Sequence, residues 1–340
     1  MNTQENFTKI NNLKVEGSHN PLGIDAEYPR FSWMMESDLQ RQRQKQTAYR
    51  ILVASSPSKL TERDADLWDS TKVISDISVA IKYNGNILEP STKYYWTVIV
   101  WNQDDIPIQT EENAYFETGL KSTDGITRWD GAKWISMKGK DVNSNGSPPL
   151  FRKETKLKGT VKSARLYISA LGVYDAYING EKLGTVTEDD KSLEIDFMPP
   201  GWTNYDATIH YMTYDVTNYI KEDAVTLAAA LGNGWWNGRI SKGNEKHGET
   251  TYYSGEENEL ALFAKLFITY DDGSIHTVVT DTQSDWKATD TGPIRSNDIY
   301  DGEEYDATME IPGWNKNDFD DSTWMNVKEH DYTKIFRTQK

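Results

Sequence analysis

The chain has 340 residues, with 53 Asp and Glu against 37 Lys and Arg, and a formal net charge of −16 at pH 7. This charge argues against nucleic-acid binding, which needs a basic face to neutralise phosphates, and no run approaches the roughly 20 apolar residues of a membrane-spanning helix. There is no cysteine, which excludes disulfides and thiol chemistry. The length favours two or three domains over a single core.

Residues 8–122 show the pattern of a fibronectin type III or immunoglobulin-like β-sandwich. Short segments of alternating hydrophobicity recur there, with turn residues between them. Their aromatic residues Trp33, Trp96 and Trp101 are expected to fill the core, because a small sandwich needs bulky fillers. The segments are Leu13–Glu16, Arg30–Met34, Ala48–Ala54, Ile77–Tyr83, Tyr94–Asn102 and Ala114–Thr118.

Residues 123–330 favour a second, larger β-sandwich of the jelly-roll (galactose-binding-like) type. Asn179-Gly180 lies between two β-prone runs and predicts a hairpin, because both residues tolerate the positive φ of a type I′ turn. Asp271–Gly273 predicts a second hairpin in the same way. No sustained helical periodicity is present, and one helical turn is expected at Asn218–Ile220, with Asp215 capping a turn before it. The predicted fold class is all-β.

Aromatic and amide side chains gather in the glycine-flanked bend that follows the apolar run Ala224–Leu231. Trp235, Trp236 and Asn237 offer flat rings and a planar amide on one loop. A pyranose presents an apolar face to a ring and hydroxyls to amides, so we predict a carbohydrate site here. Trp202 and Tyr205 are predicted to flank it. The alternative is that some of these residues only pack under the sandwich.

The sequence offers no catalytic constellation. Its histidines fit no metal-binding spacing, and no serine or threonine lies in a nucleophile elbow. Glycosidases use two carboxylates across the scissile bond, but with 53 acidic residues a pair can always be chosen, so their abundance identifies nothing. No catalytic residue is assigned.

Several motifs occur together in one order, namely Asn20–Asp25, Pro29–Trp33, Gly201–Tyr205, Gly232–Arg239 and Gly292–Ala307. In this order they resemble the N-terminal domains of bacterial α-L-rhamnosidases of glycoside hydrolase family 78. The resemblance implies a parent enzyme that hydrolyses terminal α-L-rhamnosyl groups of glycans or glycosides. Its catalytic (α/α)6 barrel would follow in the same polypeptide and is absent from this sequence. This chain is then a non-catalytic fragment that binds carbohydrate or supports the barrel.

The same resemblance implies a calcium ion. In the rhamnose-binding modules that this chain resembles, calcium is held by an aspartate or asparagine pair after the Asn-Gly hairpin and by an asparagine near the Gly-Trp motif, and the ion touches sugar hydroxyls. Asp189, Asp190 and Asn237 occupy the comparable places, and their oxygens suit a hard cation. The alternative is that Asp189 and Asp190 are simply solvated.

Two other interpretations remain open at this point. The sandwiches could form a structural scaffold with no sugar site, or the front part of a polysaccharide lyase that cleaves rhamnose-uronate linkages. Residues 1–6 lack the basic and apolar regions of a secretory signal. We expect a periplasmic or secreted protein whose signal is not part of this sequence, with a cytoplasmic protein as the alternative.

Overall fold

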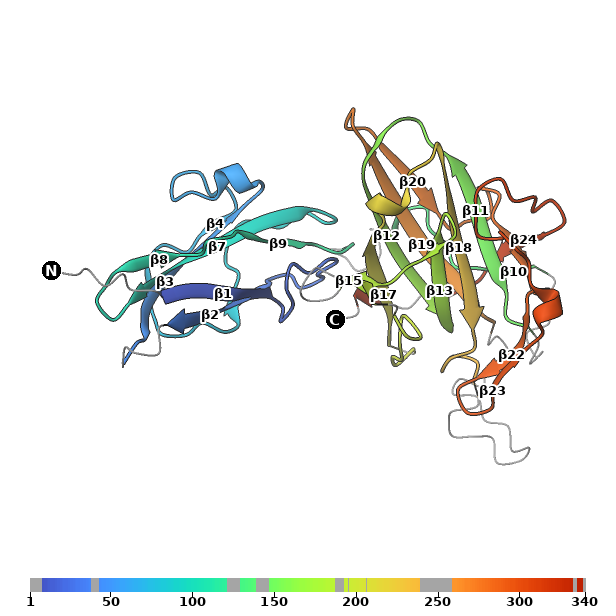
Figure 1. Cartoon of the computed structure of the whole chain (residues 1–340), viewed down its shortest axis with the longest axis horizontal. Helices are drawn as coiled ribbons and strands as arrows, with labels where there is room; N and C mark the ends of the chain where they lie inside the picture. The colour runs from blue at the N-terminus through green and yellow to red at the C-terminus, as the bar shows by residue number, and fades with distance from the viewer. Residues whose placement is uncertain are drawn as a thin grey trace. The chain divides into compact units, whose positions relative to one another are not determined.

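The computed structural model describes residues 8–37, 43–120, 129–138, 147–186, 193–194, 196–205, 207–238, 259–332 and 335–338. These residues form β-strands joined by turns, with only short 3₁₀ turns as helical elements in the described part (Figure 1). The chain divides into two compact units, Met1–Asp124 and Gly125–Lys340; the predicted division falls after residue 122. The predicted all-β class is confirmed.

The described residues of the first unit form two sheets. One has the strand order β1-β2-β6, and the other has β4-β3-β7-β8, with β5 added to β3 and β9 added to β7. All the pairs are antiparallel. The strands are β1 (Thr8–Val15), β2 (Arg30–Ser37), β3 (Gln46–Ala54), β4 (Trp68–Asp69), β5 (Val73–Ile74), β6 (Ile81–Lys82), β7 (Lys93–Asn102), β8 (Pro107–Gln109) and β9 (Ala114–Glu117).

Aromatic side chains fill the core of this unit, as predicted. Trp33 and Trp96 are buried, and the ring centroids of Trp96 and Phe31 are 4.7 Å apart. The indole Nε1 of Trp33 donates to Gln46 Oε1 at 2.9 Å, so its polar end is satisfied inside the core. Trp101 is only half-buried, with Lys72 Nζ 4.5 Å from its ring centroid.

The prediction of one continuous strand over Ile77–Tyr83 is wrong. The ladder with β2 is limited to Ile81–Lys82, and one further backbone hydrogen bond joins Trp33 N to Ser78 O at 3.0 Å. The side-chain amide of Gln46 donates to the carbonyl oxygens of Ser75 and Ile77, at 3.1 and 2.9 Å. The carbonyl groups of Ser75 and Ile77 are therefore satisfied by a side chain in place of a strand ladder, which the alternation of hydrophobic residues cannot reveal.

The second unit is built on one large curled sheet, whose halves form a sandwich. The order is β14-β13-β18-β11-β21-β24-β10-β19-β12-β17-β25, with β20 added to β19. Buried apolar residues of β12, β18 and β19 form much of its core. The strands along this path are β10 (Ile135–Met137), β11 (Leu150–Lys156), β12 (Val161–Leu171), β13 (Val173–Ile178), β14 (Glu181–Lys182), β17 (Thr208–Asp215), β18 (Ala224–Gly232), β19 (Ala261–Tyr270), β20 (Ile275–Val279), β21 (Lys287–Thr289), β24 (Met325–Glu329) and β25 (Ile335–Thr338).

Short hairpins lie outside this sheet. They are formed by β15 (Thr185–Val186) with β16 (Leu193–Glu194), and by β22 (Ile294–Asp298) with β23 (Gly302–Tyr305). The 3₁₀ turns are η1 (Pro57–Lys59), η3 (Thr217–Tyr219) and η4 (Ala307–Met309).

The predicted turns of this unit are confirmed. Asn179 and Gly180 join β13 to β14 with φ of 51° and 87°. The amide of Asn179 also ties the turn to the body of the unit: its Oδ1 accepts from Thr226 N at 2.8 Å, and its Nδ2 donates to Tyr219 O at 3.2 Å. The carboxylate of Asp215 accepts from Thr217 N at 3.0 Å and so starts η3.

A buried arginine on β11 anchors a segment that lies more than 160 residues away in the sequence. The side chain of Arg152 is 1% exposed. Its guanidinium donates to the carbonyl oxygens of Lys316 and Phe319, at 3.1 and 3.4 Å, and pairs with the carboxylate of Asp321. Glu154, on the same face of β11, accepts from Arg152 at 3.3 Å. Because a buried guanidinium keeps its charge, these acceptors are required.

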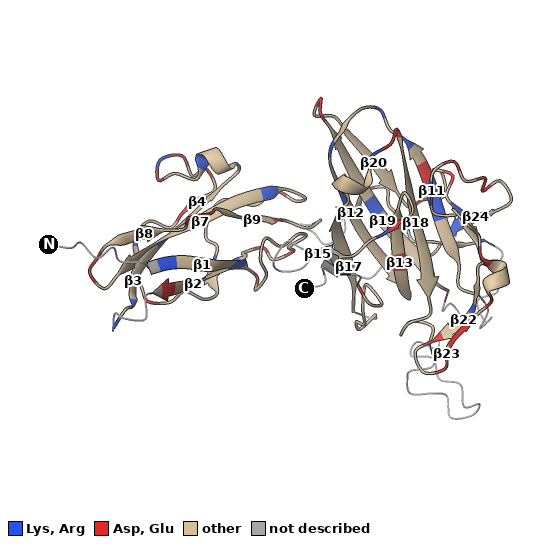
Figure 2. Cartoon of the chain, in the orientation of Figure 1, with Lys and Arg blue, Asp and Glu red and all other residues tan. Residues whose placement is uncertain are grey.

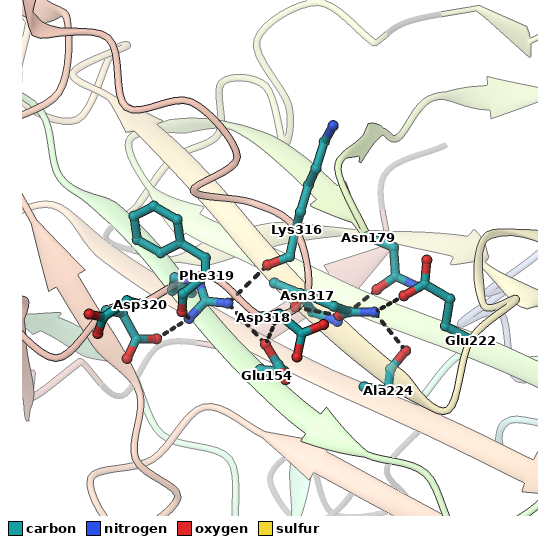
Figure 3. Close-up of polar contacts among 12 residues, drawn as sticks. Glu154, Asn179, Glu222, Ala224, Lys316, Asn317, Asp318, Phe319 and Asp320 are labelled. Atoms are coloured by element: carbon teal, nitrogen blue, oxygen red, sulfur yellow. Dashed lines mark hydrogen bonds and ion pairs between the residues drawn. The ribbon is translucent and has the colours of Figure 1, made fainter.

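Asn317 extends this attachment to the next strand (Figure 3). Its Nδ2 donates to Glu222 Oε2 at 2.6 Å and to Ala224 O at 3.2 Å, while Thr226 Oγ1 donates to its Oδ1 at 2.7 Å. Residues 316–321, which we term the clamp segment, therefore cross β11 and β18 and are held to both by polar contacts.

Replacing Arg152 with methionine should destabilise the second unit by about 3 kcal/mol, because the acceptors of the clamp segment lose their donor. Urea unfolding followed by tryptophan fluorescence measures this change. Lys133→Met provides the control, since Lys133 forms an ion pair with Glu329 at 3.0 Å in which both side chains are more than half exposed; it should cost less than about 1 kcal/mol. Equal effects of the two variants would contradict the assigned role of Arg152.

Candidate functional site

The glycine-rich bend after β18 is a tight, sterically fixed loop. We term residues 232–238 the glycine loop. Gly234 has φ of +51°, and a Cβ there would lie 2.6 Å from Val173 Cγ1. A Cβ on Gly238 would lie 2.2 Å from the carbonyl oxygen of Gly234. Only glycine fits at these two positions, so the backbone that carries the intervening side chains is closely defined.

Three asparagines hold this loop to β22. Asn233 N donates to Asn297 Oδ1 at 2.7 Å, and Asn233 Nδ2 donates to Asn297 O at 2.6 Å. Asn237 donates to Asn233 twice, from its backbone N to the carbonyl and from Nδ2 to Oδ1, both at 3.1 Å. Asn233 therefore serves the turn, as its position suggests, and it orients the amide of Asn237.

Two of the five predicted sugar-contacting residues lie in the core. Trp236 is 7% exposed and Tyr205 is 1% exposed, and their ring centroids are 5.3 Å apart in an edge-to-face arrangement. Trp236 Nε1 donates to the carbonyl oxygen of Glu259 at 3.1 Å. Tyr332 packs edge-to-face on Trp236 and donates its hydroxyl to Tyr205 O at 2.6 Å. This packing supports the loop from beneath.

The other three predicted residues are more accessible. Trp235 and Asn237 are half-buried, and Trp202 is 46% exposed on the segment that precedes Tyr205. Trp236 and Tyr205 are buried, so of the five predicted residues only Trp202, Trp235 and Asn237 can reach a ligand. Their contact with a sugar stays a prediction.

The predicted calcium ligands are only partly placed. Asp189 and Asp190 lie outside the described residues. Within the described ranges, no group of three His, Cys, Asp or Glu side chains is arranged to hold a metal ion. Asn237 fits a ligand role, because its Nδ2 is engaged by Asn233 and its Oδ1 accepts no hydrogen bond from the residues that the structure describes. An amide oxygen in that state suits a hard cation or a sugar hydroxyl.

Sequence reasoning missed Asn297 and Glu259, which hold the loop from β22 and from the start of β19. Asn297 lies 64 residues after Asn233, so no short-range spacing connects them. Its Nδ2 is buried and has no acceptor in the described part of the chain. Tyr332 was missed for the same reason, since it meets Tyr205 across 127 residues.

Glu259 is a buried carboxylate beside the glycine loop. Lys328 Nζ lies 2.9 Å from its Oε1, and His330 Nδ1 lies 3.4 Å from its Oε2. Burial alone would raise its pKa, but the hydrogen bonds and charges of His330 and Lys328 outweigh burial and lower the pKa below the ordinary 4.5. The carboxylate is therefore ionised in the folded protein at neutral pH.

Fold and loop together define a protein of two β-sandwich units with an aromatic and amide-rich loop at the end of a central strand. Two family descriptions match this chain: "Rha78A-like, N-terminal immunoglobulin domain" over residues 10–122, and "Alpha-L-rhamnosidase N-terminal domain" over residues 159–340. The chain belongs to the alpha-L-rhamnosidase N-terminal domain family. The resemblance inferred from the motifs is confirmed.

The relatives of this chain are much longer than it is. An alpha-L-rhamnosidase of Formosa agariphila is 38% identical over 334 residues, which are 95% of this chain and 33% of that protein. One of an Alteromonas species is 36% identical, over 94% of this chain and 33% of the relative. The solved alpha-L-rhamnosidase of Dictyoglumus thermophilum superposes with a TM-score of 0.81 at 34% identity, over 97% of this chain and 35% of that one. This chain thus spans about a third of each of these proteins.

Glu259→Gln should lower the stability of the second unit by about 2 kcal/mol at neutral pH, because its charge-assisted contacts are weakened. The folded-state pKa lies below the unfolded value, so this contribution is present above the unfolded pKa and is lost as pH falls through the folded pKa. The difference between the wild type and the variant should therefore shrink in urea unfolding from neutral pH to about pH 3. Glu329→Gln, at an exposed ion pair, should show no such trend; a constant difference for Glu259→Gln would refute the charge argument.

Proposed function

We propose that this chain is the non-catalytic N-terminal part of an α-L-rhamnosidase and that it binds the L-rhamnose-containing glycan or glycoside on which the enzyme acts. The parent enzyme would hydrolyse terminal α-L-rhamnosyl groups. The family match, together with the one-third coverage of its relatives, supports this assignment. The relatives named above are all alpha-L-rhamnosidases, which favours a hydrolase over the lyase alternative.

The glycine loop supplies the groups that a sugar site needs. The half-buried ring of Trp235 offers a flat apolar surface, and the adjacent Asn237 offers an oriented amide oxygen. The exposed ring of Trp202 adds a second aromatic surface. Rhamnose carries a methyl group in place of a hydroxymethyl group, so apolar rings favour it. The loop is fixed before the ligand arrives, which lowers the entropic cost of binding.

Calcium is part of the proposal. Asp189, Asp190 and Asn237 would hold the ion, which supplies a positive centre for sugar hydroxyl oxygens when it is bound. The orientation of the Asn237 amide supports its share in this role. The contribution of Asn237 to sugar binding would then depend on calcium.

A catalytic domain in the same polypeptide would be the main partner of this chain, and export to the periplasm or the medium is the proposed location. Export fits an enzyme that acts on plant or microbial glycans outside the cell. Across the described ranges, no helix has the length and apolar character that membrane crossing requires.

Calorimetric titration of this chain with L-rhamnose should give heat of binding in the presence of calcium and weaker or no binding after chelation. Trp235→Ala should weaken binding about tenfold or more, which corresponds to roughly 1.4 kcal/mol of lost ring contact. Tyr28→Ala, which removes an exposed aromatic residue from the first unit, should leave binding unchanged. Absence of heat under both conditions would favour the scaffold alternative.

The purified chain should release no rhamnose from an aryl α-L-rhamnoside, because no catalytic pair is assigned to it. Release of the aryl group, followed by absorbance against a buffer blank, measures this directly. Robust hydrolysis that survives further purification would overturn the non-catalytic assignment.

A further inference from the structure

A cleft lies between β11 and β20, and none of its lining residues belongs to the glycine loop. It has a volume of about 330 Å³ and is lined by Lys153, Glu154, Thr155, Lys156, His276, Thr277, Val278, Val279 and Ser284. This volume falls within the range of about 300–1,000 Å³ that is usual for small-ligand sites. It is large enough for a small ligand.

Two lysines of this cleft lack an acidic partner. In the described residues no carboxylate pairs with Lys153 or Lys156, although the chain has 53 acidic and 37 basic residues. Figure 2 shows basic positions along β11. Ammonium groups that line a cleft without a carboxylate attract an anion into it.

The acidic lining residue, Glu154, is committed elsewhere. Side chains alternate along a strand, so Glu154 shares the face of Arg152 and is turned toward the clamp segment, opposite to Lys153 and Thr155. Its Oε2 accepts from Asp318 N at 2.8 Å and from Arg152 at 3.3 Å. Its charge is therefore balanced on that face, where the exposed Lys156 also lies, and it does not neutralise Lys153 on the opposite face.

Neutral hydrogen-bond donors complete the cleft. Tyr270 Oη accepts from Lys158 N at 3.1 Å and lies 3.2 Å from His276 Nδ1. Burial and then the charge of Lys158 lower the pKa of His276, which favours its neutral ring, and the tautomer of that ring sets the direction of the hydrogen bond between Nδ1 and Tyr270 Oη. When Tyr270 donates to Nδ1, the ring hydrogen is on Nε2 and can be donated to a ligand. Thr155 Oγ1 adds a buried hydroxyl with no partner in the described part of the chain.

We propose that the cleft between β11 and β20 binds the anionic group of a charged sugar, either the carboxylate of a uronic acid or a sulfate ester. Lys153, on the face of Thr155, supplies the main charge complement, Lys156 adds charge from the exposed end of the strand, and Thr155 and His276 supply hydrogen-bonding groups for the same oxyanion or for a neighbouring hydroxyl. The anionic character of the ligand follows from the cleft alone. That the ligand is a sugar rests on the proposed function.

Calorimetry on the whole chain at low ionic strength tests this proposal with four probes: D-glucuronate, D-glucose 6-sulfate, D-glucose and inorganic sulfate. Glucuronate or glucose 6-sulfate should bind and glucose should not, and added salt should weaken binding. The double variant Lys153→Met/Lys156→Met should weaken binding about tenfold or more. Lys221→Met, at an exposed ion pair with Glu181, is the matched control and should have no effect.

Each outcome bears on the proposal. Preference between the two charged sugars identifies the anion, whereas binding of inorganic sulfate alone refutes a sugar ligand. Equal binding of glucose, or unchanged affinity in the double lysine variant, overturns the cleft assignment. Trp235→Ala should leave glucuronate binding intact while it weakens L-rhamnose binding, and the double lysine variant should do the reverse. These two variants therefore show separately whether the cleft proposal or the glycine-loop proposal is wrong.

Discussion

The buried guanidinium of Arg152 is the constraint on which the second unit depends. A guanidinium charge that is 1% exposed must be surrounded by acceptors. The clamp segment provides them, and in doing so it is held across β11 and β18. Trp314 lies just before that segment, and its ring centroid is 5.6 Å from that of Tyr177 on β13. This face of the sheet is therefore covered by the protein's own chain, which leaves strand ends and the gap between sheet layers for ligands.

Most of the aromatic residues of this unit serve packing, and this determines what the glycine loop can do. A continuous series of rings joins the loop to the interior, with centroid distances of 5.9 Å from Trp236 to Tyr332, 5.4 Å from Tyr332 to Trp134 and 5.0 Å from Trp134 to Phe263. Such a series supports the loop from its buried side, because close-packed rings restrict one another's movement. The few accessible side chains on it are then presented in one fixed arrangement, which suits the weak contacts of a sugar.

Local patterns predicted much of this structure because local physics decides those features. A few neighbouring residues determine each of three features. These are the positive φ at Asn179 and Gly180, the cap formed by Asp215, and the alternating strand that buries Trp96. The sequence could not show that Trp236 is inside and Trp235 partly outside, since the two are adjacent and alike. That difference is set by Tyr205, Glu259 and Tyr332, which meet Trp236 only after folding. The burial of Arg152 was hidden in the same way, because in sequence it looks like a solvent-exposed strand residue.

The net charge of −16 repels an anion at long range, but the charges within a few ångströms of the cleft determine whether an anion binds there. At physiological salt the Debye length is about 8 Å, so distant carboxylates are largely screened while groups that line the cleft are not. Glu154 is held against Arg152 and the clamp segment, which removes it from the face where Lys153 and Thr155 lie. The clamp thus has a second consequence: by engaging the acid of β11 on one face, it leaves Lys153 on the other face available to an anion.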